Sequence, residues 1–117
     1  MWVTTLPTGG VRLVVGFLNL HVVPCEGGVN VTWTGAGIVR VGDAGPFLVG
    51  TRSPRLTTRL KWGQQVLLFT NGDDVDLVAR HRGDFDRLYI DAPAGIPIQR
   101  QDADADRPLF RGRGAPS

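Results

Sequence analysis

The feature that most limits the possible folds is a series of short extended runs, separated by turn residues, in the second half of the chain. Five such runs fall within 45 residues, at 56–60, 66–70, 75–78, 87–90 and 96–100. The breaks between them contain Gly63, Asn71-Gly72, Arg82-Gly83-Asp84 and Asp91-Ala92-Pro93. Parallel strands need crossovers of a dozen or more residues, so runs this close together predict an antiparallel, all-β unit.

The first half has the same rhythm, with strands predicted at 1–6, 11–15, 17–23, 29–34 and 38–41. Val29, Val31 and Trp33 alternate with polar residues, which is the period-two pattern of a strand with one buried face. The segment 42–55 is rich in glycine and proline around a short apolar island at 47–49, and it is predicted to be a connector. Pro93 and Gly95 are expected to form the turn that aims the last run, and a positive φ would make glycine essential there. Residues 103–117 are expected to be a flexible tail.

Composition agrees with a strand-rich chain and limits the functions that it can have. Sixteen glycines and eight prolines are too many for a helical bundle. Twelve of the thirteen basic residues are arginine, whose planar fork suits guanine and phosphate, and Lys61 is the exception. The formal net charge is only +2, so any nucleic-acid binding must depend on where the arginines are placed.

Several classes of protein are not expected. Cys25 is the only cysteine, which excludes an internal disulfide and makes a reducing cytoplasm the expected location. No run approaches the roughly 18 apolar residues of a membrane-spanning helix, so no membrane partner is expected. His21, His81 and the clustered aspartates lack the spacing of a metal site, so no metal or cofactor is expected. No nucleophile or phosphate-loop motif is found, and we do not expect an enzyme.

A set of short motifs in the second half occurs in a fixed order. They are Arg59 before Gly63, then Gly72-Asp73-Asp74-Val75, Arg82-Gly83-Asp84, Arg87-Leu88-Tyr89-Ile90-Asp91-Ala92-Pro93 and finally Ile96-Pro97-Ile98-Gln99-Arg100. In this order, residues 56–102 resemble the carbon storage regulator family (CsrA/RsmA), which are small bacterial RNA-binding regulators of translation. The Asp-Ala-Pro motif followed by Ile-x-Ile-x-Arg is the most specific part of the resemblance.

The resemblance implies a five-stranded unit that dimerises by exchanging its first and last strands. In the family, RNA with a GGA loop binds where the first strand of one copy meets the last strand of the other. Matched position by position, the implied RNA-binding residues are Arg100, Ile98, Arg59, Gln99 and Pro97. Arg100 takes the place of the family's essential arginine, while Gln99 stands where histidine is common. A strand-end arginine of this kind is expected to contribute little to the stability of the core.

The first half has no counterpart in a single-copy family, and two arrangements are open. Residues 1–41 are weakly similar to the second half at a spacing of 53 to 56 residues, with Trp33 in parallel to Tyr89. If they are a diverged second copy, the chain is a monomeric pseudo-dimer in which the first strand of one half lies hydrogen-bonded beside the last strand of the other. That copy lacks an arginine at the Arg100 position. Otherwise residues 1–41 cover a unit that forms a strand-exchanged homodimer.

The expected function is post-transcriptional regulation by RNA binding. The protein is expected to bind single-stranded or hairpin-loop RNA that contains GGA and to repress translation by covering a ribosome-binding site. The rival is a non-catalytic structural or protein-interaction β-module, such as a small protein of a viral particle. Such a module would share the turn-rich strands and the modest charge.

Overall fold

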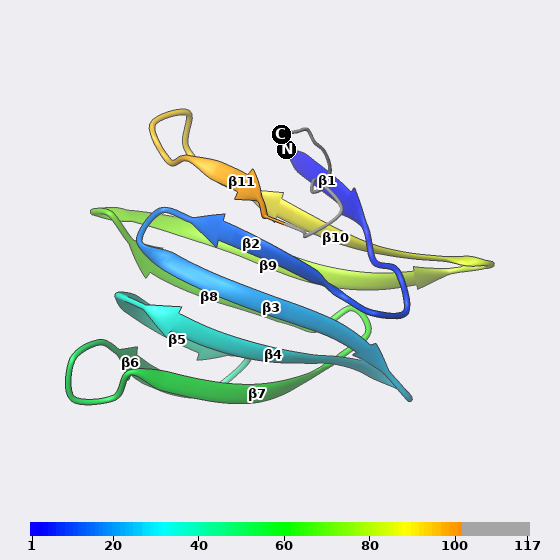
Figure 1. Cartoon of the computed structure of the whole chain (residues 1–117), viewed down its shortest axis with the longest axis horizontal. Helices are drawn as coiled ribbons and strands as arrows, with labels where there is room; N and C mark the ends of the chain where they lie inside the picture. Colours follow the sequence, from blue (N-terminus) through cyan, green and yellow to red (C-terminus); the bar gives the residue numbers. More distant parts are fainter. Residues whose placement is uncertain (102–117) are drawn as a thin grey trace, which may run out of the picture.

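The computed structural model describes residues 1–101, which form strands and turns without a helix. In this part of the chain eleven strands follow one another (Figure 1). They are β1 (Trp2–Thr5), β2 (Val11–Val15), β3 (Leu18–Cys25), β4 (Gly28–Gly35), β5 (Gly37–Val41), β6 (Ala44–Val49), β7 (Arg55–Lys61), β8 (Gln65–Thr70), β9 (Asp73–Arg82), β10 (Phe85–Asp91) and β11 (Ile98–Arg100). All neighbouring strands pair antiparallel. The prediction of an all-β chain is confirmed.

The strands form two sheets that enclose one core. Sheet A has six strands in the order β1-β10-β9-β8-β5-β6, and sheet B has five in the order β11-β2-β3-β4-β7. In Figure 1 the strands of sheet B lie in front of those of sheet A. The core is a single cluster of apolar side chains from both sheets, and Trp33 is the largest of its fully buried members. The chain is therefore a two-layer β-sandwich.

Alternating polarity along the strands produces the two layers. In β2 the side chains of Val11, Leu13 and Val15 are buried, while Arg12 between them is exposed. Successive side chains of a strand point to opposite faces, so this pattern gives each sheet an inner apolar face and an outer face. Between β8 and β9, Asn71 has a φ of 54° and Gly72 a φ of 81°. Both values are positive, as the predicted tight hairpin turn requires.

The two halves of the chain exchange their first and last strands. Sheet A combines β1 and β5 of the first half with β8, β9 and β10 of the second. Sheet B combines β2, β3 and β4 of the first half with β7 and β11 of the second. The middle three strands of each half are thus flanked by the first and last strands of the other half. This is the exchange between halves that the pseudo-dimer alternative requires, and it takes place within one chain.

The pairing differs from the expectation in one respect. Each first strand is hydrogen-bonded to the fourth strand of the other half and not to its last, since β1 pairs with β10 and β7 pairs with β4. The last strand β11 pairs instead with β2. The strands β1 and β11 are therefore outer strands of different sheets, and they meet at one open side of the sandwich through side chains.

The segment 42–55, predicted to be a connector, contains a strand at its centre. Ala44–Val49 form β6, which pairs with β5 and extends sheet A. Its apolar island is too short to indicate a strand alone, and the pairing with β5, which buries Val49, fixes it as one. Residues 1–41 and 56–102 also do not form separate sheets, because β7 and β11 pair only with strands of the first half.

Two remaining expectations concern the tail and membranes. The predicted flexible tail at 103–117 lies outside the described residues. Within residues 1–101 the fold offers no helix with the length and apolar character needed to cross a membrane.

Candidate nucleic-acid interface

The last strand places the sequence-predicted residues on two different faces. In the pairing of β11 with β2, Ile98 lies opposite Val15 and Arg100 opposite Leu13. Val15 and Leu13 are core residues, so Ile98 and Arg100 point toward the space between the sheets. Gln99 lies between them in the strand, and its exposed side chain belongs to the outer face of sheet B. Ile98 packs against the core as a partly buried residue.

Arg100 closes the open side of the sandwich between β11 and β1. Its Nη1 donates a hydrogen bond to the hydroxyl oxygen of Thr4, over 2.8 Å. The side chain of Thr4 is nearly buried, whereas that of Arg100 is half-buried. The contact joins the outermost strands of two different sheets and holds the guanidinium at the rim of the core. Arg100 therefore also has a structural contact, in addition to the RNA-binding role that the resemblance implies.

Backbone hydrogen bonds fix the two ends of β11. The carbonyl oxygen of Pro97, whose ring is exposed, accepts from the N–H of Gly16 at 2.9 Å. At the other end, the N–H of Gln101 donates to the carbonyl oxygen of Arg12 at 2.7 Å. The short strand is therefore anchored to β2 over its whole length, and the side chains of Pro97 and Gln99 are presented outward.

Arg59 does not join this group. It lies on β7, at the opposite edge of sheet B from β11, with β2, β3 and β4 between. Four strand spacings of about 4.8 Å separate the two backbones by roughly 19 Å. The guanidinium of Arg59 instead donates to the carbonyl oxygen of Glu26 in the β3–β4 turn. The structure brings Arg100, Ile98, Gln99 and Pro97 together, whereas Arg59 lies apart from them at the opposite edge of sheet B.

The pairing registers of equivalent strands in the two halves show which residues take the positions of Arg100 and Arg59 on each open side. Val39 of β5 pairs with Leu68 as Arg100 of β11 pairs with Leu13, so Val39 occupies the Arg100 position in the first half. Likewise Thr5 of β1 corresponds to Arg59 of β7, because each directly precedes a buried leucine, Leu6 or Leu60. Each side of the sandwich therefore has one arginine of the pair. The Arg59 side is also altered by β6, which pairs with the outer edge of β5.

Charge is distributed unevenly between the two sheets. The strands of sheet B contain no aspartate or glutamate, and their five basic residues are Arg12, Arg55, Arg59, Lys61 and Arg100. The strands of sheet A contain five aspartates, at positions 73, 74, 76, 86 and 91. A surface with cations and without carboxylates attracts anions even when the net charge of the whole protein is small.

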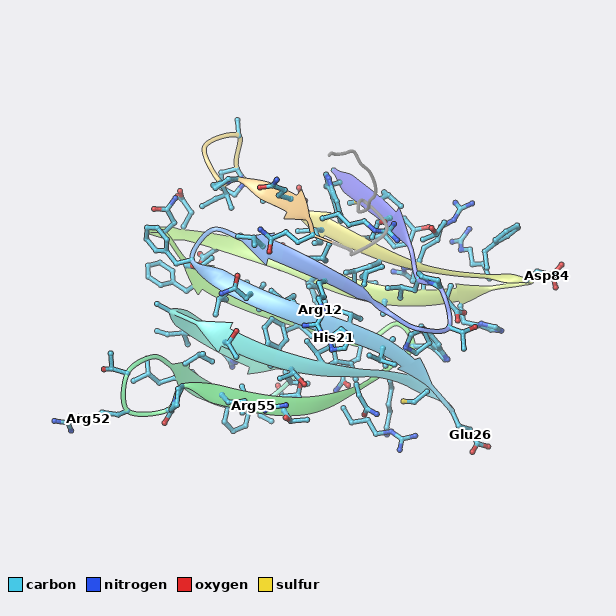
Figure 2. All side chains as sticks on the ribbon, in the orientation of Figure 1. Arg12, His21, Glu26, Arg52, Arg55 and Asp84 are labelled. Carbon is cyan, nitrogen blue, oxygen red and sulfur yellow. The ribbon has the colours of Figure 1, made fainter. Side chains whose placement is uncertain are left out.

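The outer face of sheet B also carries a polar hollow of about 400 Å³. Its polar walls are formed by Arg12, Asn19, His21, Thr32, Thr34, Arg55 and Gln101. Figure 2 shows Arg12 and His21 close together on neighbouring strands and Arg55 farther away on β7. Sequence reasoning did not find this group, because its members come from five strands or their ends. The available signal was the polar residues at alternate positions in β3 (Asn19 and His21) and in β4 (Asn30, Thr32 and Thr34).

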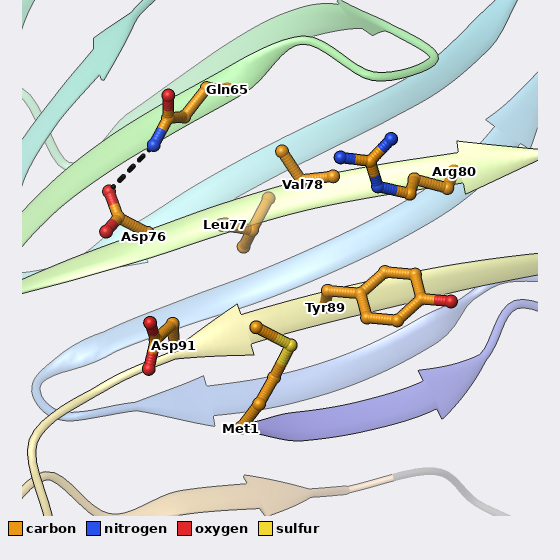
Figure 3. Close-up of a pocket in the computed structure, with 8 residues that line it drawn as sticks. All are labelled: Met1, Gln65, Asp76, Leu77, Val78, Arg80, Tyr89 and Asp91. Atoms are coloured by element: carbon orange, nitrogen blue, oxygen red, sulfur yellow. Dashed lines mark hydrogen bonds between the residues drawn. The ribbon is translucent and has the colours of Figure 1, made fainter.

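A second depression, of about 280 Å³, lies on the outer face of sheet A (Figure 3). Asp76, Asp91 and Arg80 line it together with apolar side chains, so its charges are of mixed sign. The Nε2 of Gln65 donates to a carboxylate oxygen of Asp76 at 3.2 Å. Residues 1–101 contain no cluster of three side chains arranged to hold a metal ion. This depression offers an anion much less than the hollow of sheet B does.

Comparisons of the chain with protein-family models, with curated proteins and with solved structures find no match.

Proposed function

We propose that this protein binds single-stranded RNA at the open side of the sandwich between β1 and β11, without catalysing a reaction. The observation that carries the proposal is the position of Arg100. Its guanidinium lies half-buried at the rim where the first strand of one half meets the last strand of the other. A guanidinium held in this way has lost part of its conformational freedom before RNA binds, which lowers the entropic cost of a bidentate contact to guanine.

The surroundings of Arg100 support the same proposal. Gln99 and Pro97 are exposed beside it, and Ile98 provides an apolar surface at the rim. Bases splayed out of a loop present hydrogen-bonding edges to such groups. The strands of sheet B add positive charge without a competing carboxylate. The strand exchange between halves also agrees with the resemblance to the carbon storage regulators.

In the proposed mechanism the protein acts by occlusion. A GGA-containing stretch near a ribosome-binding site binds at the β1–β11 side, and the bound protein blocks initiation of translation. The proposed location is the cytoplasm, where ribosomes translate messenger RNA. Because Val39 replaces the arginine on the other side, one chain is proposed to hold one GGA element and not two.

The test is fluorescence anisotropy with a GGA-loop hairpin RNA and a hairpin of scrambled loop sequence. The expected result is preferential binding of the GGA hairpin and a loss of about 1–3 kcal/mol of binding free energy in Arg100→Ala. Arg100→Lys keeps the charge but not the fork, so it is expected to restore only part of the affinity. Equal binding of both hairpins by the wild-type protein would contradict sequence-selective RNA binding.

A second candidate is a protein-interaction module, and one observation on sheet A favours it. Ile38 lies opposite both Phe69 and Leu48, and Leu67 is close to this row on β8. Leu67, Phe69 and Leu48 are 39%, 45% and 64% exposed. Exposed apolar residues side by side are a common feature of protein interfaces. A wild-type protein that forms oligomers, together with a monomeric Phe69→Asp variant, would support this candidate.

A further inference from the structure

The polar hollow on the outer face of sheet B lies outside the proposed RNA-binding side between β1 and β11. Its side chains form two neighbouring rows across the sheet. One row runs from Arg12 on β2 through His21 on β3 to Thr32 on β4. The other runs from Asn19 on β3 through Thr34 on β4 to Arg55 on β7. The two arginines thus stand at opposite corners, with hydroxyl, amide and imidazole groups between them.

The chemistry of the hollow is that of a phosphate-binding surface. Arginine, threonine and asparagine are residues that donate to phosphate oxygens and sugars in nucleic-acid complexes. Among the described residues, His21 is the only aromatic member of the lining, and the only apolar members are Leu13 and Leu20, which are buried. Within residues 1–101, no carboxylate lines it. Most of the lining groups are hydrogen-bond donors, so the hollow is suited chiefly to the backbone of a nucleic-acid strand.

The hollow is continuous with the proposed RNA-binding side. Gln101 lines it and directly follows Arg100, and the N–H of Gln101 donates to the carbonyl oxygen of Arg12. An RNA strand with a base at Arg100 therefore meets Gln101 and Arg12 next. From β11 to β7 the face extends over four strand spacings, or about 19 Å. Several nucleotides are needed to cover this distance.

We propose that the hollow on sheet B binds the phosphodiester backbone of single-stranded RNA, next to the bases held at the β1–β11 side. This inference rests on the proposed function and adds a second part to its site. Arg12 and Arg55 neutralise phosphates, and Asn19, Thr32 and Thr34 donate to phosphate or ribose oxygens. Affinity then has two components: a sequence-selective one at Arg100, and one in the hollow that depends on salt and on strand length.

The test compares two single-stranded RNAs that share a central GGA, one of about 6 and one of about 16 nucleotides. The short strand reaches the β1–β11 side only, whereas the long strand also covers the hollow. Affinities are measured by anisotropy over a range of salt concentrations for the wild-type protein, for Arg55→Gln and for Arg82→Gln. Arg82→Gln removes an exposed arginine of sheet A and makes the same change of charge.

Arg55→Gln is expected to reduce the salt slope for the long RNA by about 0.7, which is the loss of one phosphate contact to a single strand. At 0.1 M salt this slope corresponds to an affinity about fivefold lower. The short RNA is expected to bind Arg55→Gln and the wild type equally, and Arg82→Gln is expected to bind both strands as the wild type does.

The outcomes separate the two proposals. If the long RNA binds and Arg55→Gln behaves like Arg82→Gln, the hollow is not a phosphate site, while the function at Arg100 stands. An equal loss for the short and the long RNA in Arg55→Gln would also overturn the hollow, because it would report a general effect on the fold or the field. If neither RNA binds the wild-type protein, both proposals are wrong.

Discussion

The guanidinium of Arg100 and the hydroxyl of Thr4 are joined by a 2.8 Å hydrogen bond, although 96 residues separate them in the sequence. The bond connects the outermost strand of sheet B with that of sheet A at a side of the sandwich where no backbone hydrogen bond joins the two strands. Arg100 is therefore placed to serve two roles. It fastens the open side, and it places a guanidinium at the rim.

The first prediction concerns the structural role of this pair. Thr4→Val removes the acceptor but keeps the size of the side chain, and it should lower the free energy of unfolding by about 1–2 kcal/mol, because Arg100 then loses a partly buried partner. This differs from the sequence-based expectation that Arg100 contributes little to stability. The measurement is urea unfolding followed by tryptophan fluorescence, since Trp33 is fully buried. Thr5→Val, on the exposed face of the same strand, is the matched control and should leave stability nearly unchanged.

The same variant separates the two roles of Arg100. Thr4→Val keeps the guanidinium, so it should retain most of the RNA affinity, whereas Arg100→Ala should lose both stability and affinity. Equal losses of RNA affinity in the two variants, measured well below their unfolding transitions, would show that Arg100 acts only by holding the two strands together.

The second prediction concerns Thr70, which is buried where the ends of three strands meet. Its hydroxyl oxygen accepts from the N–H of Phe17 at 2.9 Å, and the hydroxyl donates to the carbonyl oxygen of Ala36 at 3.1 Å. Thr70→Val should cost about 1–3 kcal/mol of unfolding free energy, because it leaves an N–H and a carbonyl without this partner at a partly buried site. Thr57→Val, on the outer face of β7, makes the same chemical change at an exposed site and should be close to neutral in the same urea experiment. Similar costs for the two variants would contradict this account of Thr70.

Local sequence patterns were sufficient for most of the strands. Alternation around Val31 and Trp33 and the dipeptide Asn71-Gly72 predicted a strand and a turn that the structure confirms. Such signals succeed because strand polarity and turn geometry depend on residues close together in the chain. The importance of Gly95 was conditional on a positive φ, which depends on how the chain reaches the last strand. Gly95 is not among the glycines with positive φ, and a side chain there would meet open space.

The exact pairing of strands that are far apart in the chain could not be predicted from one sequence. The resemblance identified Arg59 and Arg100 together, but in the observed strand order they lie on opposite sides of the sandwich. The hollow with Arg12 and Arg55 was missed for the same physical reason. Its rows exist only through the register of β2, β3, β4 and β7, and register is set by the core and not by a local motif.

The third prediction concerns glycine at a close approach between strands. A Cβ added to Gly28 would lie 1.8 Å from the carbonyl oxygen of Leu60 on β7, so Gly28→Ala must displace one of the two paired strands. We expect a loss of about 3 kcal/mol or more in unfolding free energy. Gly95→Ala is the matched control, since nothing lies within 4 Å of its added Cβ, and it should be tolerated. A wild-type melting temperature for Gly28→Ala would show that β4 and β7 are not paired in this register.

The last prediction concerns assembly. The middle three strands of each half are flanked by strands from the other half of the same chain. The full-length protein should therefore be a monomer in light scattering at micromolar concentration. A fragment that starts at Pro54 contains β7 to β11 but lacks the strands that pair with β7 and β11. As a monomer it would leave both strands without partners and much of its core exposed, so it should be unfolded or should form strand-exchanged dimers. Mixing it with a fragment of residues 1–53 should restore the monomeric sandwich as a one-to-one complex with the wild-type tryptophan spectrum. Two results together would contradict the pseudo-dimer: a dimeric full-length protein, and a folded dimer of the fragment from Pro54 that does not bind the fragment of residues 1–53. The exchange would then take place between chains.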